Sequence, residues 1–314
     1  PRDVDLGVSL TNRIQLQIPL MSAAMDTVTE ARVAIGMAQA GGLGVIHRNM
    51  TPQQQGEEVA RVKKFESGVI TEPVCIQESA TVRDVINVVR DKGISGLPVL
   101  DSNRRLTGIV TRRDIRFGPN EASCVTEIMT PKERLVTVSP DAKRADIATL
   151  LHEHRIEKVL LVDSEFRLVG IVTAKDLNKE VDFPLASKDK LGRLQVAAAI
   201  GTGEDTESRI EQVLLAGADA VVVDTAHGHS TIVLEVVRQI KRHNPGIDVV
   251  AGNIATAEAA CAMVEAGADV IKVGIGPGSI CTTRIVAGVG VPQITAVHNV
   301  ARALEGENVT IISD

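Results

Sequence analysis

Short apolar runs recur along the chain outside residues 69–181, and each is followed by a stretch with helical spacing of its apolar residues. The runs do not alternate apolar with polar positions, so they are typical of strands buried on both faces of a parallel sheet. The sequence AGAD, at 216–219 and 266–269, ends two helical stretches with a glycine and leads straight into the next run. We expect a helix at 30–40 and seven strands, at 18–25, 42–47, 196–201, 220–228, 248–255, 269–276 and 309–314.

The even rhythm of strand and helix favours a (β/α)8 TIM barrel over an open doubly wound sheet. Such a barrel closes with eight strands, and seven are visible in this α/β pattern. A barrel that ended there would leave two unpaired strand edges, which is costly. We therefore expect the closing strand and further polypeptide to belong to the natural protein.

An internal repeat interrupts this rhythm between about Val69 and Val181. Residues 97–115 align without gaps to 159–177, and nine of the 19 positions are identical. The duplication predicts two β-α-β-β-α units, at 69–124 and 125–181, inserted into a barrel formed by 1–68 and 182–314. The repeated pattern resembles a tandem pair of CBS domains (a Bateman module).

Four polar residues occupy matching positions in the two repeats: Thr111, Asp114, Thr173 and Asp176. In CBS domains, residues at such positions often hold the ribose and phosphates of adenine or guanine nucleotides, so the resemblance implies that ATP or GTP could bind here. Alternatively, the threonines cap helices and the aspartates complement the helix N-termini. The duplication alone leaves both interpretations open.

Polar residues and one methionine follow the expected barrel strands, at the end where functional residues of such barrels lie. They are Ser22, Met25, Asp26, His47, Arg48, Asp224, Thr225, His227, His229, Asn253, Ser313 and Asp314. The stretch DTAHGHS at 224–230 places an aspartate beside two histidines, but its loop spacings put no two imidazoles on one helix face, which disfavours zinc. Asp224 is better suited to accept hydrogen bonds from sugar hydroxyls.

The loop GIGPGSICTTR, at 274–284, combines three glycines with a cysteine. It does not match G-x-G-x-x-G, because Ser279 stands where the last glycine belongs, so a dinucleotide-binding turn of the Rossmann type is disfavoured. Cys281 lies in a polar loop beside Arg284, whereas Cys261 lies in an apolar helical run. Nearby cations or amide dipoles lower a thiol pKa and make the sulfur nucleophilic. The spacing therefore indicates a functional cysteine at position 281.

Composition excludes several classes of protein. A net charge of −6, no Trp, no Tyr and only four Phe argue against nucleic-acid binding. No apolar run is long enough to cross a membrane, and the first residues do not resemble a signal peptide, so we expect a cytoplasmic protein. The four cysteines are scattered without a C-x-x-C motif, which indicates neither a disulfide framework nor a structural zinc site.

Several motifs together resemble the IMP dehydrogenase family in its bacterial form. They are SAAMDTVTE (22–30), GGLGVIHRNM (41–50), DTAHGHS, AGNIAT (251–256), the cysteine loop with GVGVPQ behind it, and the CBS-like pair. The likeness covers essentially the whole chain. It implies a (β/α)8 barrel in a homotetramer, or an octamer through the CBS domains, which oxidises IMP to XMP with NAD⁺ as a step toward guanine nucleotides.

The resemblance also implies roles for individual residues. Cys281 would attack C2 of the purine and form a covalent thioimidate, and Thr283 would help to position the reacting centre. The implied IMP-binding residues are Ser279, Asp314, Met25 and Gly278, and the implied NAD-binding residues are Asp224, Thr225, Asn253, Gly274, Ile275 and Gly276. Backbone carbonyls of Gly276, Gly278 and Cys281 would bind K⁺.

Two alternatives compete with this interpretation. GMP reductase has the same barrel and a similar cysteine loop, but most of its forms lack a CBS pair, so residues 69–181 favour the dehydrogenase. A nucleotide sensor with CBS domains and an inactive barrel is a second alternative, against which the intact cysteine loop argues. The family's hydrolytic base and the rest of its potassium site are expected beyond Asp314, and we expect no turnover from residues 1–314 alone.

Overall fold

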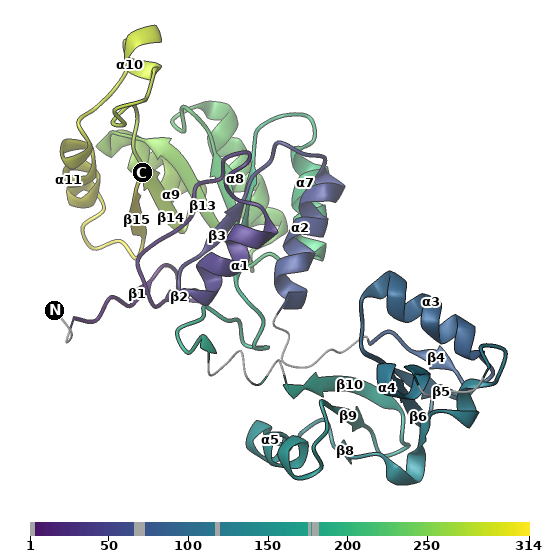
Figure 1. Cartoon of the computed structure of the whole chain (residues 1–314). Helices are drawn as coiled ribbons and strands as arrows, with labels where there is room; N and C mark the ends of the chain where they lie inside the picture. Colours follow the sequence, from purple (N-terminus) through teal and green to yellow (C-terminus); the bar gives the residue numbers. More distant parts are fainter. Residues whose placement is uncertain (1–3, 66–72, 117–119, 175–176, 178–181) are drawn as a thin grey trace. The chain divides into compact units, whose positions relative to one another are not determined.

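The computed structural model of the chain describes residues 4–65, 73–116, 120–174, 177 and 182–314. The chain divides into two compact units, one formed by Pro1–Glu66 with Phe183–Asp314 and the other by Ser67–Asp182. The second unit is thus inserted into the sequence of the first (Figure 1). The boundary between two inner repeats at 124 and 125 stays a prediction.

The first unit is built on a curled, TIM-barrel-like sheet of six parallel strands in the order β15-β14-β13-β12-β11-β3. One cluster of buried apolar residues lies between these strands and the helices, and a second lies on the other face, inside the curl. Both faces are covered, which explains why the strand sequences do not alternate. The strands are β3 (Gly44–Ile46), β11 (Val196–Ile200), β12 (Ala220–Asp224), β13 (Asp248–Ile254), β14 (Val270–Val273) and β15 (Thr310–Ser313).

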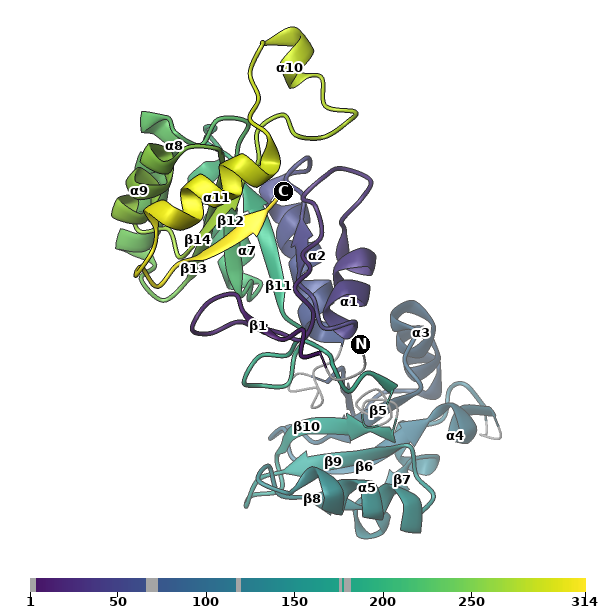
Figure 2. The same cartoon turned by 90° about the vertical axis from the view of Figure 1, so that its left-hand side faces the viewer.

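Helices lie on the outside of the curl (Figures 1 and 2). They are α1 (Ala31–Gln39), α2 (Pro52–Phe65), α7 (Thr206–Leu215), α8 (Thr231–His243), α9 (Ala257–Ala266) and α11 (Gln293–Ala303), while the short α10 (Thr283–Val286) belongs to a loop. Gly217 and Gly267, in the two AGAD sequences, have φ angles of 91° and 103°. The left-handed helix ends predicted from the repeat are therefore confirmed.

The expected strand at 18–25 is wrong in extent. Within this segment the structure has a single parallel bridge, between Met21 and Leu43. Pro19 has no N–H to donate to a ladder, and the N–H of Val45 donates to the side-chain oxygen of Ser22 at 3.0 Å instead of to a backbone carbonyl. A side chain thus replaces the backbone partner, and the first barrel strand shrinks to this bridge. A small hairpin of β1 (Val8–Ser9) and β2 (Gln15–Leu16) precedes it.

The inserted unit contains two similar βαββ arrangements that share apolar contacts. The first forms a sheet in the order β4-β5-β6-β7 and the second a sheet in the order β10-β9-β8. Leu100 and Leu106 of the first pack with Leu160 and Ile171 of the second in one buried cluster. The elements are β4 (Ile76–Gln77), α3 (Val82–Lys92), β5 (Gly96–Leu100), β6 (Leu106–Thr111), α4 (Arg112–Arg116), β7 (Thr130–Pro131), β8 (Thr137–Val138), α5 (Arg144–Glu153), β9 (Lys158–Val162) and β10 (Leu168–Thr173).

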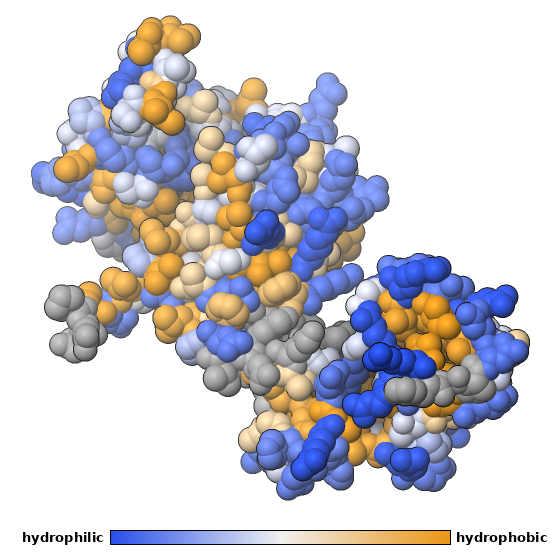
Figure 3. Space-filling model, viewed as in Figure 1, coloured by the Kyte–Doolittle hydropathy of each residue, from blue (hydrophilic) through white to orange (hydrophobic). Residues whose placement is uncertain are grey.

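Within the described residues, no helix combines the length and apolar character that a membrane crossing requires. Large apolar side chains are nevertheless exposed on the loop around α10, where Ile280, Ile285 and Val286 are among the most exposed of the chain (Figure 3). This loop connects β14 to α11 and carries the cysteine singled out above.

Candidate active site

Four polar side chains meet at the carboxyl ends of neighbouring strands of the barrel unit. Asp224 ends β12, Asn253 lies in β13, Lys272 lies in β14 and Asp314 follows β15. The Lys272 ammonium lies 2.8 Å from Asp224 Oδ1 and 2.9 Å from Asp314 Oδ2. Asn253 Nδ2 donates to the same Asp314 oxygen at 2.8 Å and to the carbonyl oxygen of Gly274 at 2.7 Å. The fold thus brings together residues that are 90 positions apart in the sequence.

This group retains unused hydrogen-bonding capacity. Asn253 Oδ1 is buried and accepts no hydrogen bond from the described residues. An orphaned buried acceptor is costly, and it is common where a ligand completes the site. A cavity of about 420 Å³ runs along β15 beside the group, and its polar lining comes from Ser22, Lys272, Thr310, Ser313 and Asp314. The site can therefore accept hydroxyl groups of a ligand.

Lys272 is absent from the residues predicted from the sequence. A signal was available, because Lys272 is the only charged residue in the buried strand sequence VIKV. A charged side chain is rarely placed in such a strand unless it is paired. The burial of Lys272 works to lower its pKa, but the carboxylates of Asp224 and Asp314 outweigh that effect and raise it. Burial opposes ionisation of Asp314 as well, yet the hydrogen bonds from Asn253 and Lys272 leave its pKa lowered.

The cysteine loop lies on the chain directly after β14. The pKa of the Cys281 thiol is lowered, first by hydrogen bonds from the side chain and backbone of Thr283 and to a smaller extent by the charge of Arg284. The shift has the direction predicted from the sequence, with Thr283 and not a cation as its main cause, and a catalytic role of Cys281 stays a prediction. Cys281, Ser279 and Met25 do not line the cavity beside Asp314, and Met25 is 60% exposed.

The same loop was predicted to offer three carbonyl oxygens to K⁺. In the described structure the Gly278 carbonyl accepts hydrogen bonds from the N–H of Cys281 at 3.1 Å and from the Arg284 guanidinium at 3.2 Å. Both lone pairs of this oxygen are then in use. The loop in this conformation therefore does not fit a potassium site.

His47, also predicted at this end of the barrel, is buried and faces two carboxylates. Its Nε2 lies 3.5 Å from Asp26 Oδ1 and 3.6 Å from Glu30 Oε1, a spacing compatible with a shared metal ion. However, the backbone N–H of Asn49 donates to His47 Nδ1 at 3.1 Å. The neutral ring therefore carries its proton on Nε2, and a protonated nitrogen cannot bind a metal. Nε2 itself has no hydrogen-bond partner among the described residues, and a metal ion at this group is disfavoured.

Of the four nucleotide-binding candidates in the inserted unit, the structure places two in one cavity. Thr111 and Asp114 line a space of about 440 Å³ together with Arg134, Arg155 and Lys158 of the second repeat. Asp114 Oδ2 accepts hydrogen bonds from the backbone and hydroxyl of Thr111, both at 2.7 Å. The carboxylate thus lies at the start of α4, as the helix-capping interpretation predicts for the aspartate, whereas the Thr111 hydroxyl donates to it instead of accepting from a helix N–H. Thr173, at the end of β10, does not line this cavity. Asp176 lies outside the described residues.

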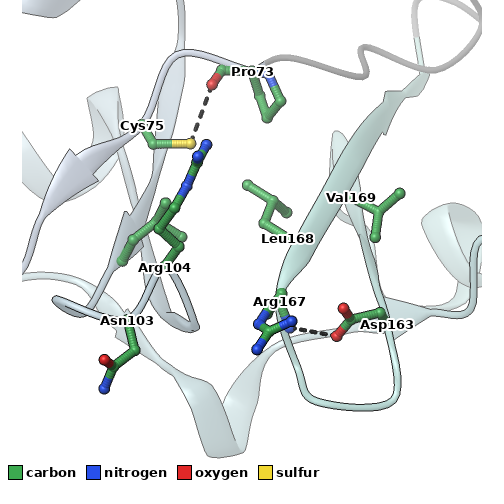
Figure 4. A pocket seen from close by; sticks show the side chains of 9 residues that line it. Pro73, Cys75, Asn103, Arg104, Asp163, Arg167, Leu168 and Val169 are labelled. Atoms are coloured by element: carbon green, nitrogen blue, oxygen red, sulfur yellow. Dashed lines mark hydrogen bonds between the residues drawn. The ribbon is translucent and has the colours of Figure 1, made fainter.

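A second cavity of the inserted unit, of about 660 Å³, contains no predicted site residue (Figure 4). Arg104 and Arg167 face it from the turns after β5 and β9, and Cys75 points into it. Burial raises the pKa of the Cys75 thiol, and the charge of Arg104 only partly offsets this. The thiol of Cys75 is thus a poor nucleophile, in contrast to that of Cys281.

Comparison with known proteins settles the family. The model of the IMP dehydrogenase / GMP reductase domain matches residues 1–314. The chain belongs to this family. Inosine-5'-monophosphate dehydrogenases of Haemophilus influenzae and Escherichia coli K12 are each 49% identical to it over 314 residues, and that of Aquifex aeolicus is 50% identical over 316 residues. All of this chain is covered in each case, and the chain spans 64% of the length of these relatives.

Among solved members of the IMP dehydrogenase / GMP reductase family, a GMP reductase of Trypanosoma brucei in complex with guanosine 5'-triphosphate has a TM-score of 0.91 and 37% identity. It covers 100% of this chain, and the chain covers 76% of it. Because the match includes the inserted unit, residues 69–181 do not by themselves exclude a GMP reductase, and the expectation that they favour the dehydrogenase stays a prediction. Sequence identity distinguishes the two groups better, since this chain is 49% identical to the dehydrogenase of Haemophilus influenzae and 37% identical to this reductase.

Proposed function

We propose that the full-length protein oxidises IMP to XMP with NAD⁺. The observation that carries the proposal is a thiol of lowered pKa, Cys281, on the loop that follows β14, the strand whose Lys272 contacts the carboxylates of Asp224 and Asp314. The identity of about 49% to enzymes named inosine-5'-monophosphate dehydrogenase supports the same reaction. A cysteine suits this chemistry because a covalent adduct divides one difficult substitution into two steps.

In the first step, the Cys281 thiolate forms a bond to C2 of the hypoxanthine ring. Bound NAD⁺ supplies the acceptor for the hydride that leaves C2, so the purine is oxidised and stays attached to sulfur as a thioimidate. In the second step, water adds to C2, the C–S bond breaks, and XMP is released with Cys281 regenerated. Thr283 stabilises the thiolate in the free enzyme. The base that activates the water is expected outside residues 1–314.

The remaining residues would bind the two substrates. Asp314 would accept hydrogen bonds from the IMP ribose, Ser279 and Gly278 would contact its phosphate, and Met25 would pack on the purine. Asp224, Thr225 and Asn253 would contact the nicotinamide ribose, beside the backbone of Gly274, Ile275 and Gly276. The orphaned Asn253 Oδ1 fits such a role, because a ribose hydroxyl would give it a donor. The loop must move toward Asp314 for Cys281 to reach a purine whose ribose is bound there.

The test is an assay of the full-length protein with each pair of substrates. We expect absorbance of NADH to appear with IMP and NAD⁺, and XMP to accumulate in equal amount. Consumption of NADPH with GMP, without reaction of IMP, would show a GMP reductase instead. Absence of both reactions, with nucleotide binding retained, would support the sensor alternative.

For the inserted unit we propose a regulatory site for a purine nucleotide, ATP or GTP, in the cavity of Thr111 and Asp114. Five basic residues line this cavity, against the carboxylates of Asp114 and Glu157, and guanidinium groups suit phosphates; the five are Arg112, Arg113, Arg134, Arg155 and Lys158. Calorimetry on the full-length protein should show binding that Arg155→Ala weakens and that Arg83→Ala, outside the cavity, leaves unchanged. Equal affinity in both variants would contradict this site.

Two further features stay predictions. One is the assembly into tetramers or octamers, which light scattering with and without ATP would measure. The other is the binding of K⁺ at Gly276, Gly278 and Cys281, which requires that Gly278 release its present hydrogen bonds. An increase in the rate of IMP oxidation with K⁺, and not with Na⁺, would support it.

A further inference from the structure

The side chain of Lys272 contacts two carboxylates at once. Its side chain is only 17% exposed, and its ammonium contacts Asp224 on one side and Asp314 on the other. In the function proposed above, Asp224 binds the ribose of the cofactor and Asp314 binds the ribose of the substrate. A single ammonium thus connects the binding residues of both ligands.

The register of the sheet shows how Lys272 reaches Asp224, which lies two strands away. Asp224 of β12 is paired with Gly252 of β13, and Gly252 is paired with Lys272 of β14. A Cβ atom at Gly252 would lie 2.6 Å from the Lys272 carbonyl oxygen and 2.7 Å from its Cβ. Real Cβ atoms do not approach so closely, so only glycine fits here. The missing side chain at position 252 leaves the path from Lys272 to Asp224 open.

The contacts leave one oxygen of each carboxylate available. The Lys272 ammonium contacts Oδ1 of Asp224, and Oδ2 of Asp314 accepts hydrogen bonds from both Lys272 and Asn253. Within the described part of the chain, Asp224 Oδ2 and Asp314 Oδ1 have no hydrogen-bond partner. Each carboxylate is therefore held in one orientation with an acceptor left for a hydroxyl group.

We infer that Lys272 is a positioning residue that holds the substrate-binding and the cofactor-binding carboxylates with one shared charge, and that Gly252 is required for this bridge. The inference rests on the proposed function. Without the ammonium, two carboxylates would face each other uncompensated, and each would lose the partner that orients it. Removal of Lys272 should therefore weaken the binding of both ligands together, although they contact different residues.

The test is steady-state kinetics on the full-length protein and its Lys272→Met variant. Loss of a charge-assisted hydrogen bond corresponds to about a ten- to hundredfold effect. We expect KM for IMP and KM for NAD⁺ each to rise by about that factor, with a smaller decrease in kcat. Lys272→Arg keeps the charge and should recover most of the affinity for both ligands.

Lys241→Met is the matched control, because Lys241 also contacts a carboxylate of the same sheet, that of Asp269 at 2.9 Å, and is 22% exposed. It lies at the opposite strand ends, so both KM values should stay unchanged. Gly252→Ala should reproduce the double increase in KM, and thermal melting of each variant reports whether it is folded.

The outcomes separate this inference from the function on which it rests. If the unsubstituted protein does not oxidise IMP with NAD⁺, the proposed function is wrong, and the inference is wrong with it. If the protein is active and Lys272→Met changes neither KM, or only one of them, the shared role of Lys272 is contradicted while the function stands. A decrease in melting temperature with unchanged KM values would also contradict it, because the residue would then be only structural.

Discussion

The two ends of the parallel strands differ in how their charges are paired. At the amino ends, Asp219 and Asp269 close the two AGAD sequences and each contacts a lysine. Asp219 lies 2.8 Å from Lys63, which also contacts Asp189, and Asp269 lies 2.9 Å from Lys241. Each carboxylate also accepts a backbone N–H from the neighbouring strand. The carboxylate oxygens of these two aspartates thus find their partners within the protein. The repeated AGAD sequence has the same structural role at both positions.

At the carboxyl ends, Lys272 also contacts two aspartates, but here Asn253 keeps a buried acceptor without a partner among the described residues. Cys281, whose thiol pKa is lowered, lies on the loop that follows the carboxyl end of β14. The ion pairs of Asp219 and Asp269 use all their acceptors within the protein and stabilise the fold, whereas the unpartnered acceptor of Asn253 can bind a ligand. The comparison agrees with the general division of barrels into a stability face and a functional face.

The sharpest test of this division is the Cys281→Ala variant. We expect turnover of IMP to fall by about a thousandfold or more, because no other group can form the covalent adduct. The melting temperature should stay unchanged, since the loop contributes little to the core. Cys261→Ala, on the exposed side of α9, is the control and should keep its activity. Substantial turnover in Cys281→Ala would show that the proposed nucleophile is wrong.

Lys63→Met tests the opposite end. Lys63 is 3% exposed and contacts both Asp189 and Asp219. Its loss leaves the largely buried carboxylate of Asp219 without a cation, while Asp189 keeps Arg193. We expect the free energy of unfolding to fall by about 3–5 kcal/mol, with KM values unchanged. Urea denaturation followed by circular dichroism measures the effect.

The control for Lys63→Met is Arg238→Met, which removes an exposed ion pair with Glu235. That variant should lose no more than about 0.5 kcal/mol. Equal destabilisation by both substitutions would contradict the special role of the amino-end network.

The smallest expected effect concerns the pH dependence of Cys281. Because the pKa of its thiol is lowered by Thr283, the thiolate should form at lower pH than in a free cysteine, whose pKa is about 8.5. Alkylation of Cys281 by iodoacetamide, followed by peptide mass spectrometry, should therefore reach half its maximal rate below that pH. Thr283→Val should move the midpoint upward, and Thr283→Ser should restore it. A midpoint that does not depend on the hydroxyl would assign the activation to Arg284.

Much of the barrel was predictable because its signals are local. The runs predicted at 196–201, 220–228 and 248–255 contain β11, β12 and β13, although β12 already ends at Asp224, and each has enough buried residues to identify a strand. The segment 18–25 was mispredicted because its outcome depends on a side chain of Ser22 that replaces a backbone partner in another strand. Local periodicity contains no information about such a substitution.

The sequence by itself determined the parallel α/β pattern, the duplication within the inserted unit, and Cys281, Asp224, Asn253 and Asp314 as candidates for chemistry. These follow from periodicity, from identity between repeats and from residue type at strand ends. Only the tertiary structure decided that Lys272 joins Asp224 to Asp314 across Gly252, because the bridge depends on the register of three strands. It also decided that Lys63 and Asp219, 156 residues apart, pair beneath the sheet. Contacts of this kind are fixed by packing between distant segments, and no local pattern encodes them.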